Sequence, residues 1–353
     1  MMLFNAMEKM EATNQLNFIT GLSHNQRYIP IPSFNYLELI QKIKKGNRFR
    51  IFTNNLTAFP HPNIPNLYKT NLGDTVYNHI FDNLQNPYTT GQFQSAWIHP
   101  EIALLSQLML KHNLHQFNLD AYQQIEHACE TCFADFKVHI QTRAFTSQIQ
   151  SWITRYRSCS NRYDRFFEFI YGESSNFELH SLIVQRKRPN GLEPTFGDHD
   201  FRSMTAYEIV KEKCNEIIQD VWKKRSKNNV LGILSREEID IYQTCSIRLI
   251  FIVEKEYSDL VQFKDTHLYE MLEPHFIELN NDRIALGNIG TINSGIAPLF
   301  QEQEQNYYDL KQIHVGNRLN ALKAQLVIPN YLFRIGDDSC SLNIERGQTQ
   351  YNR

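Results

Sequence analysis

Apolar residues recur at helical spacing along the first third of the chain. The spacing predicts a helix capped by Ser33, whose buried face is formed by Tyr36, Leu37, Ile40 and Ile43. Further helices are expected over 74–85, over 100–112 and along an amphipathic stretch from 119 to 157. Residues 53–68 contain three prolines and four asparagines, a composition that predicts a loop. The pattern therefore favours a mainly helical region over residues 1–175.

The pattern changes after residue 175. Short apolar runs predict strands at 181–188, 230–241 and 245–257, and the last two read as a hairpin. Between the first two runs, Val210, Cys214, Ile217 and Val221 follow helical spacing after Ser203. A helix over 265–279, an irregular passage, a helix over 307–323 and a final strand over 324–336 complete the order. The elements thus run β-α-β-β-α-(insert)-β.

This order is the split βαβ arrangement, an antiparallel sheet with helices on one face. We expect an α+β protein with a helical region over 1–175 and a βαββαβ core over 176–353, with an insert around 280–306. Ferredoxin-like domains, RNA-recognition domains and HUH-type replication nucleases share this core. The fold alone does not select among these functions.

Composition narrows the class of protein. The 353 residues are 42% hydrophobic and 21% charged, which is typical of a globular chain. No apolar stretch is long enough to span a bilayer, and the start lacks the features of a secretory signal, so we expect a cytoplasmic protein without a membrane partner. The six scattered cysteines then favour reduced thiols.

Charge is distributed unevenly along the chain. The formal net charge is −2, which removes the simplest argument for nucleic-acid binding, a chain that is basic overall. Residues 150–227 nevertheless carry a net charge of +3, whereas residues 228–353 carry −6. The middle of the chain is therefore where an anionic partner is expected.

The main candidate for such contacts is the segment 155–169. It interleaves four arginines with four aromatic residues, namely Arg155, Arg157, Arg162 and Arg165 with Tyr156, Tyr163, Phe166 and Phe167. Guanidinium groups and aromatic faces together can hold a phosphate backbone and stack bases. The competing interpretation is a helix that packs its aromatics inward and its arginines outward. Further candidates follow the first strand, at Arg186, Lys187 and Arg188, with Lys223, Lys224, Arg225 and Lys227 after the adjacent helix.

Other residues that could bind a metal or act in catalysis can also be explained by a structural role. Cys129 and Cys132 form a single CxxC without a second pair, so packing within a helix is favoured over zinc or redox work. Asp198, His199 and Asp200 lie in a loop where acidic residues also form turns. Tyr307, Tyr308 and Tyr331 lack an identifiable base or metal partner. We therefore expect no metal and no cofactor.

Two segments of the carboxyl-terminal half resemble a known protein family. The stretch VLGILSREEIDIYQTCSIRLIFIVEKEY (230–257) and the stretch NYLFRIGDDSCSLNIERGQ (330–348) look like the corresponding regions of YagK/YfjJ-type proteins of prophages and filamentous phages. That family implies a replication-initiator-like, HUH-type fold that holds a divalent ion with two histidines beside a tyrosine nucleophile. The resemblance covers at most residues 180–348.

When the family's residues are matched to this chain one by one, the metal ligands are missing. The two histidines fall on Ser246 and Arg248, and the strand glutamate falls on Glu237 or Glu238. The tyrosine would fall near 336–338, where the chain has none. Arg248 cannot bind a metal ion, but its guanidinium can contact a phosphate in a bidentate manner.

The sequence thus predicts a nucleic-acid-binding protein of phage or mobile-element type that lacks metal-dependent nicking. Its expected partner is single-stranded or double-stranded DNA. Two alternatives stay open: a protein-interaction or regulatory module that uses a degenerate replication-type fold, and an enzyme of unrecognised chemistry. A clustered basic face would favour the first hypothesis, and a broad exposed apolar patch would favour a protein partner.

Overall fold

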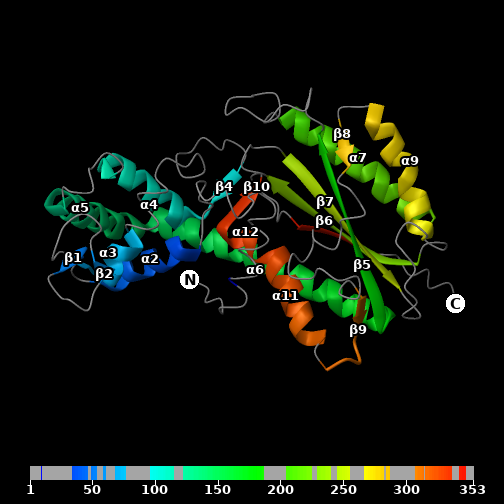
Figure 1. Ribbon diagram of the computed structural model, residues 1–353, viewed down its shortest axis with the longest axis horizontal. Coiled ribbons are helices and arrows are strands. Elements are labelled where there is room, and N and C mark those ends of the chain that lie inside the picture. Colours follow the sequence, from blue (N-terminus) through cyan, green and yellow to red (C-terminus); the bar gives the residue numbers. More distant parts are fainter. Residues whose placement is uncertain are drawn as a thin grey trace. The chain divides into compact units, whose positions relative to one another are not determined.

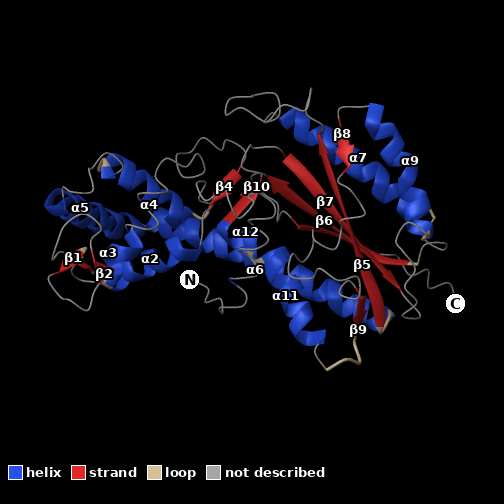
Figure 2. Cartoon of the chain, viewed as in Figure 1, coloured by secondary structure: helices blue, strands red, loops and turns tan. Residues whose placement is uncertain are grey.

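The structure is a computed structural model of the chain, and it divides into two compact units. It describes residues 9, 34–46, 49–53, 59–60, 68–76, 96–114, 122–186, 204–224, 229–239, 245–254, 266–281, 284–286, 307–313, 315–335 and 342–346. The helical unit comprises residues 24–156 and 331–334, and the sheet unit comprises residues 1–23, 157–330 and 335–353. The boundary falls within helix α6 (Arg143–Glu173), which supplies residues to both units. Helices and antiparallel sheets are both present, which confirms the α+β class (Figure 2).

Amphipathic helices build the helical unit (Figure 1). These are α2 (Phe34–Lys45), α4 (Pro100–Lys111), α5 (Tyr122–Ile140) and the first half of α6. Ile40 of α2, Leu105 of α4 and Phe133 of α5 are fully buried, as their helical spacing requires. The predicted helices after Ser33 and over 100–112 are therefore confirmed, and the amphipathic stretch from 119 to 157 forms α5 and α6 with a break at 141–142.

A small sheet and a capped helix complete this unit near α2. Strands β1 (Phe52–Thr53), β3 (Tyr68–Lys69) and β2 (Phe59–Pro60) pair in that order. Helix α3 (Asn71–Val76) follows, and the hydroxyl of Thr70 accepts a hydrogen bond of 2.9 Å from the backbone N–H of Gly73, which caps it. The prediction of a loop over 53–68 is thus wrong at these strand residues. Of the predicted helix over 74–85, α3 accounts for the start, and residues 77–85 lie outside the described ones.

Residues from near the end of the chain belong to the helical unit. Strand β10 (Phe333–Ile335) pairs with β4 (Ala96–Ile98), and the backbone N–H of His99 donates to the carbonyl of Leu332 at 2.8 Å. The indole N–H of Trp152 donates to the carbonyl of Tyr331 at 2.9 Å. The Tyr331 ring lies against the rings of His99 and Tyr156. The packing of this unit therefore includes a segment that is distant in sequence.

The sheet unit is built on antiparallel strands in the order β11-β6-β7-β5-β8. The strands are β5 (Asn176–Arg186), β6 (Val230–Ile239), β7 (Cys245–Glu254), β8 (Ile284–Leu286) and β11 (Leu342–Arg346). Strand β9 (Tyr307–Asp309) pairs with the start of β5, whereas β8 pairs with its end. The predicted strand 181–188 and the predicted hairpin are confirmed as β5 and as β6 with β7.

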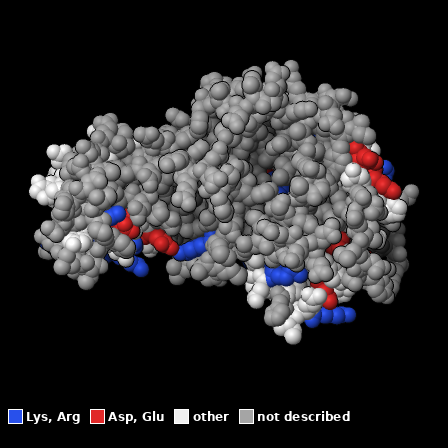
Figure 3. Space-filling view, in the orientation of Figure 1, with Lys and Arg blue, Asp and Glu red and all other residues white. Residues whose placement is uncertain are grey.

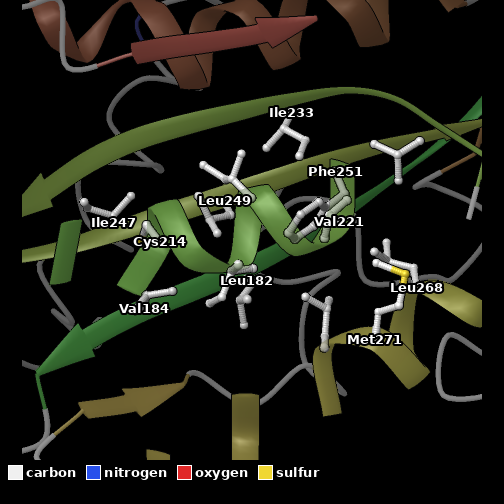
Figure 4. Packing of buried hydrophobic residues seen from close by; sticks show 14 of the residues in the cluster. Leu182, Val184, Cys214, Val221, Ile233, Ile247, Leu249, Phe251, Leu268 and Met271 are labelled. Atoms are coloured by element: carbon white, nitrogen blue, oxygen red, sulfur yellow. The ribbon is translucent and has the colours of Figure 1, made fainter. Parts of the chain in front are cut away.

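Two helices cover one face of the sheet, which we call the α7 face. Helices α7 (Met204–Lys223) and α9 (His267–Asn281) pack on alternate residues of the central strands. Leu182 of β5, Ile233 of β6 and Leu249 of β7 belong to this cluster with Val221 of α7 and Leu268 of α9 (Figure 4). The predicted helical spacing after Ser203 and the helix over 265–279 are confirmed.

Helix α6 packs on the opposite face, which we call the α6 face. Its Phe166 lies so close to Gly232 of β6 that a methyl group there would meet the ring at 2.5 Å. Phe167 contacts the ring of Phe177 of β5, which stacks on Tyr308 of β9 at 5.2 Å. Both faces of the sheet are thus covered, and side chains on central strands lie away from water.

Predictions about the end of the core differ from the structure. The predicted helix over 307–323 is wrong at its start, because residues 307–309 form strand β9. Residues 315–327 form helix α11 (Val315–Val327), followed by α12 (Pro329–Leu332), so most of the predicted strand 324–336 is helical. The strand that pairs at the outer side of β5 is instead β8, which lies within the predicted insert 280–306. Leu322, Leu326 and Val327 are buried at helical spacing, and a short apolar run is compatible with either structure until its packing is known.

The contact at Gly232 generates a stability prediction. Changing Gly232→Ala should lower the free energy of unfolding by about 1–3 kcal/mol, because the buried Phe166 ring cannot move aside without disturbing Phe167. A urea denaturation midpoint measures this. Gly172→Ala in α6 is the matched control, since beyond the adjoining helix backbone no atom lies within 4 Å of the added methyl group. Equal midpoints for the two variants would contradict the packing of α6 on the sheet.

Candidate nucleic-acid interface

Helix α6 sorts its two residue types onto opposite sides. Its aromatic residues Tyr156, Tyr163, Phe166 and Phe167 are buried, whereas Arg155, Arg157, Arg162 and Arg165 are exposed. The interpretation with inward aromatics and outward arginines therefore describes this helix. The buried rings are not available to stack on bases, and what the helix offers a ligand is its guanidinium groups.

Arginines are the sole charged residues of α6 before Asp164. From Arg143 to Tyr163 the helix contains four arginines and no acidic residue. Serine, threonine, asparagine and glutamine fill most of the remaining exposed positions. Acidic residues appear only at Asp164 and beyond, and Asp164 is paired with Lys323 of α11 at 2.6 Å. The helix thus presents cations among neutral hydrogen-bonding groups.

Three of the four arginines lie in the sheet unit and share a side of the helix. Arg165 follows Arg162 by three residues and Arg157 by eight, and both separations place side chains on neighbouring parts of a helical face. Arg155 precedes the boundary and belongs to the helical unit. Arg157 and Arg165 have no ion pair among the described residues, whereas Arg155 and Arg162 make further interactions. On the face drawn in Figure 3, the described residues include charged groups of both signs.

The other predicted basic residues do not join this face in the described structure. Arg186 ends β5, and its side chain, like Lys187 and Arg188, lies outside the described residues. Lys223 ends α7 and pairs with Asp220 at 3.1 Å. Because α7 covers the opposite face of the sheet from α6, Lys223 and Lys224 form a separate basic site. Arg225 and Lys227 lie outside the described residues.

Arg248 lies inside the protein. It is 1% exposed, and its Nη1 donates a hydrogen bond of 3.2 Å to the hydroxyl of Ser181 on β5. Directly opposite it in the β6–β7 register stands Arg236, which is also 1% exposed. These two are the largest of the fully buried side chains among the described residues. Both arginines also make other interactions, so they belong to the packed interior and not to an exposed surface.

Arg236 is the residue that sequence reasoning missed. It follows an apolar run in the segment VLGILSREEI, where an arginine looks like the solvent-exposed end of a strand. Its position opposite Arg248 depends on the hairpin register, and its burial depends on coverage of the α6 face. The single signal in the sequence is that both arginines lie within apolar strands predicted to pair.

Cys129 and Cys132 lie on the buried side of α5. Both are free thiols, and burial raises the pKa of Cys132 to about 12 and that of Cys129 above its usual range. Zinc binding and nucleophilic chemistry both require a thiolate, so these residues are in the state typical of packing. Cys214 of α7 is likewise a buried free thiol. Cys159 is disulfide-bonded, so the prediction of reduced thiols is wrong for this residue.

Two of the three tyrosines singled out in the sequence, Tyr308 and Tyr331, pack against other aromatic rings. Tyr308 is buried on Phe177, with the guanidinium of Arg318 4.4 Å from its ring centre. Burial raises the pKa of Tyr308 to about 12, although Arg318 opposes this shift. Tyr331 is buried in the helical unit, and Tyr307 is half-buried on β9. The raised pKa keeps the Tyr308 hydroxyl neutral, which does not suit a nucleophile.

The described part of the chain has neither a cluster of metal ligands nor a helix suited to a membrane. No three His, Cys, Asp or Glu side chains there converge to hold a metal ion. Asp198, His199 and Asp200 lie outside the described residues. Among the described helices, none has the length and apolarity needed to cross a membrane.

Comparison with known proteins adds no assignment. No protein family matches the chain, and neither a curated protein nor a solved structure is significantly similar to it. The likeness to YagK/YfjJ-type proteins therefore stays a prediction.

The environment of the CxxC pair generates a chemical prediction. At about pH 8, iodoacetamide should alkylate Cys129 and Cys132 slowly in the folded protein and rapidly after unfolding, because burial keeps both as neutral thiols. Peptide mass spectrometry measures the modified fraction at each site. A zinc chelator added before the reagent should change neither rate. Rapid alkylation of either residue in the folded protein would contradict the packing role.

Proposed function

We propose that the protein binds the phosphate backbone of nucleic acid through the exposed arginines of α6, in a phage or mobile-element context. The main observation behind the proposal is that the arginines and the aromatic residues lie on opposite sides of this helix. Its arginines are exposed while its aromatic residues anchor it in the interior. A rigid helix anchored in this way can present several guanidinium groups to an extended polyanion at once.

The sheet topology supports the replication-like part of the proposal. Strands β8-β5-β7-β6 with α7 and α9 on one face are compatible with a ferredoxin-like βαββαβ core, and β11 extends that sheet beyond β6. In RNA-recognition domains, bases stack on an exposed sheet face. Here α6 covers that face, so the interface is expected on the outer side of α6 and not on the sheet.

The chemistry of such an interface is backbone contact without base readout. Guanidinium groups match phosphate oxygens in bidentate hydrogen bonds, whereas sequence recognition needs side chains that reach base edges. The exposed arginines of α6 are accompanied by serine, threonine, asparagine and glutamine and not by exposed aromatic residues. We therefore infer binding with little sequence preference.

No nicking activity is included in the proposal. At the positions where the resembled family holds its metal, this chain has Ser246 and Arg248 on β7. A guanidinium group repels a divalent cation, so Arg248 is unsuited to replace a histidine ligand. The enzyme hypothesis is left without a candidate site in the described residues.

Within the described part of the chain, no specific observation favours the protein-interaction alternative. Among the described residues, the large apolar side chains that are exposed are Val138, Ile209 and Ile313. They belong to α5, to α7 and to the turn before α11, so each comes from a different element. Surfaces that dock protein partners are usually larger and contiguous.

Removal of the α6 arginines tests the proposal. The triple variant Arg157→Ala, Arg162→Ala and Arg165→Ala should bind a fluorescent oligonucleotide at least about 30-fold more weakly at low salt, because each lost phosphate contact removes its counterion release. Fluorescence anisotropy with single-stranded and double-stranded DNA and RNA measures the affinity. Circular dichroism establishes that the variant remains folded.

The matched control carries the same loss of charge on the opposite face of the sheet. Changing Lys211, Lys223 and Lys224 to Ala, on or directly after α7, should reduce affinity by less than about threefold, since only long-range attraction is weakened. Equal losses in the two triple variants would indicate general charge attraction and would contradict an α6 interface. Absence of binding by the parent protein would end the proposal.

A further inference from the structure

We propose that the disulfide of Cys159 is a redox switch for the α6 interface. With the bond formed, α6 holds its exposed arginines in fixed positions and binds nucleic acid more tightly than it does after reduction. This regulation rests on the proposed function, because it acts on the same helix. It follows from the position of Cys159 on α6 and from the distance in sequence to its partner cysteine.

Cys159 lies on the buried side of α6, at the level of the exposed arginines. Its side chain is 1% exposed and disulfide-bonded. It follows Arg157 by two residues and precedes Arg162 by three, and both arginines are exposed. Phe166, which packs on the sheet, comes seven residues after Cys159, about 10 Å along the helix. The disulfide therefore attaches α6 about two turns before this aromatic anchor.

The partner of Cys159 is distant in the sequence. Three of the six cysteines are free thiols, namely Cys129, Cys132 and Cys214. The partner is therefore Cys245 or Cys340, which lie 86 and 181 residues after Cys159 and belong to the same sheet unit. A crosslink that closes so long a loop strongly restricts the chain. It ties the arginine-bearing part of α6 covalently to another segment of the sheet unit.

Polar contacts join the same part of α6 to α11 and α12. The side-chain amide of Asn330 is buried and donates to Sγ of Cys159 at 3.6 Å. Five residues after Cys159, Asp164 pairs with Lys323 at 2.6 Å, and both side chains are partly exposed to water. Such an ion pair contributes little to stability. Because the covalent bond is stronger than either contact, its loss is expected to loosen this part of the helix.

Reduction by a dithiol opens the bond in two balanced steps. A thiolate of the reagent attacks one sulfur of the pair, and the other sulfur leaves as a thiolate that takes up a proton. The second thiol of the reagent then displaces the remaining cysteine, so the reagent becomes a disulfide and the protein gains two thiols. Two thiols need more room than two bonded sulfurs, and Cys159 lies in a packed interior. The helix must therefore shift around Cys159.

Binding by the unaltered protein in two redox states tests the switch. Fluorescence anisotropy with a labelled oligonucleotide would be measured before and after equilibration with dithiothreitol, and again after reoxidation. The reduced form should bind at least about fivefold more weakly, because its arginines must then be ordered during binding. Reoxidation should restore the affinity. Peptide mass spectrometry without reduction identifies the partner of Cys159.

Two alanine variants assign the effect to Cys159. Cys159→Ala should bind like the reduced parent and should not respond to dithiothreitol. Cys214→Ala is the matched control, since Cys214 is a buried free thiol on α7, and it should keep the full response. Circular dichroism shows whether each form keeps its helices. The comparison of redox states uses the unaltered protein, so it stands even if Cys159→Ala fails to fold.

Failure of the switch can be told apart from failure of the proposed function. Equal affinity in the oxidised and reduced states would overturn the switch and leave the proposed function standing, whereas absence of binding in both states would end both. Loss of the helical signal on reduction would make the disulfide a requirement for folding and not a switch. A Cys159 thiol that stays unpaired after oxidation would also overturn the proposal.

Discussion

Coverage of the central sheet on both faces is the constraint on which the rest of the structure depends. Strand β7 lies between β5 and β6, with α7 and α9 packed on one face and α6 on the other. Alternate residues of β7 therefore enter two different interiors, and Phe251 and Ile252, neighbours in sequence, are both fully buried. The same coverage shields Arg248 from water. A large ligand would therefore contact the helices and not the faces of the sheet.

Helix α6 connects packing to the proposed function. Phe166 and Phe167 bind it to the sheet, and this anchoring orients Arg157, Arg162 and Arg165 outward. A helix held at this many positions loses little further freedom when it binds a polyanion, which limits the entropic cost of association. The proposed interface and the core therefore depend on the same helix, and a change that loosens the packing of its aromatic side would also alter the positions of the arginines.

Local periodicity predicted most of the elements but not their partners. The spacing of Val210, Cys214 and Val221 established α7, because helical burial is a property of one segment. The run 324–336 was misassigned since apolar residues alone do not distinguish a buried helix from a strand. Strand β8 is short, and its pairing with β5 joins residues far apart in the sequence, which a local pattern does not reveal. For the candidate site, exposure of the α6 arginines followed from amphipathicity, whereas the pairing of Arg236 with Arg248 required the register of the hairpin.

The central claim is that a small set of arginines contacts phosphates directly, and the salt dependence of binding by the parent protein tests it most directly. Affinity for a labelled oligonucleotide would be measured from about 50 to 300 mM salt. Contacts by the α6 arginines predict a linear plot of log K against log[salt] with a slope of roughly −2 to −4, at about 0.7 to 0.9 per neutralised phosphate. A slope near zero, or no binding at the lowest salt, would contradict the account.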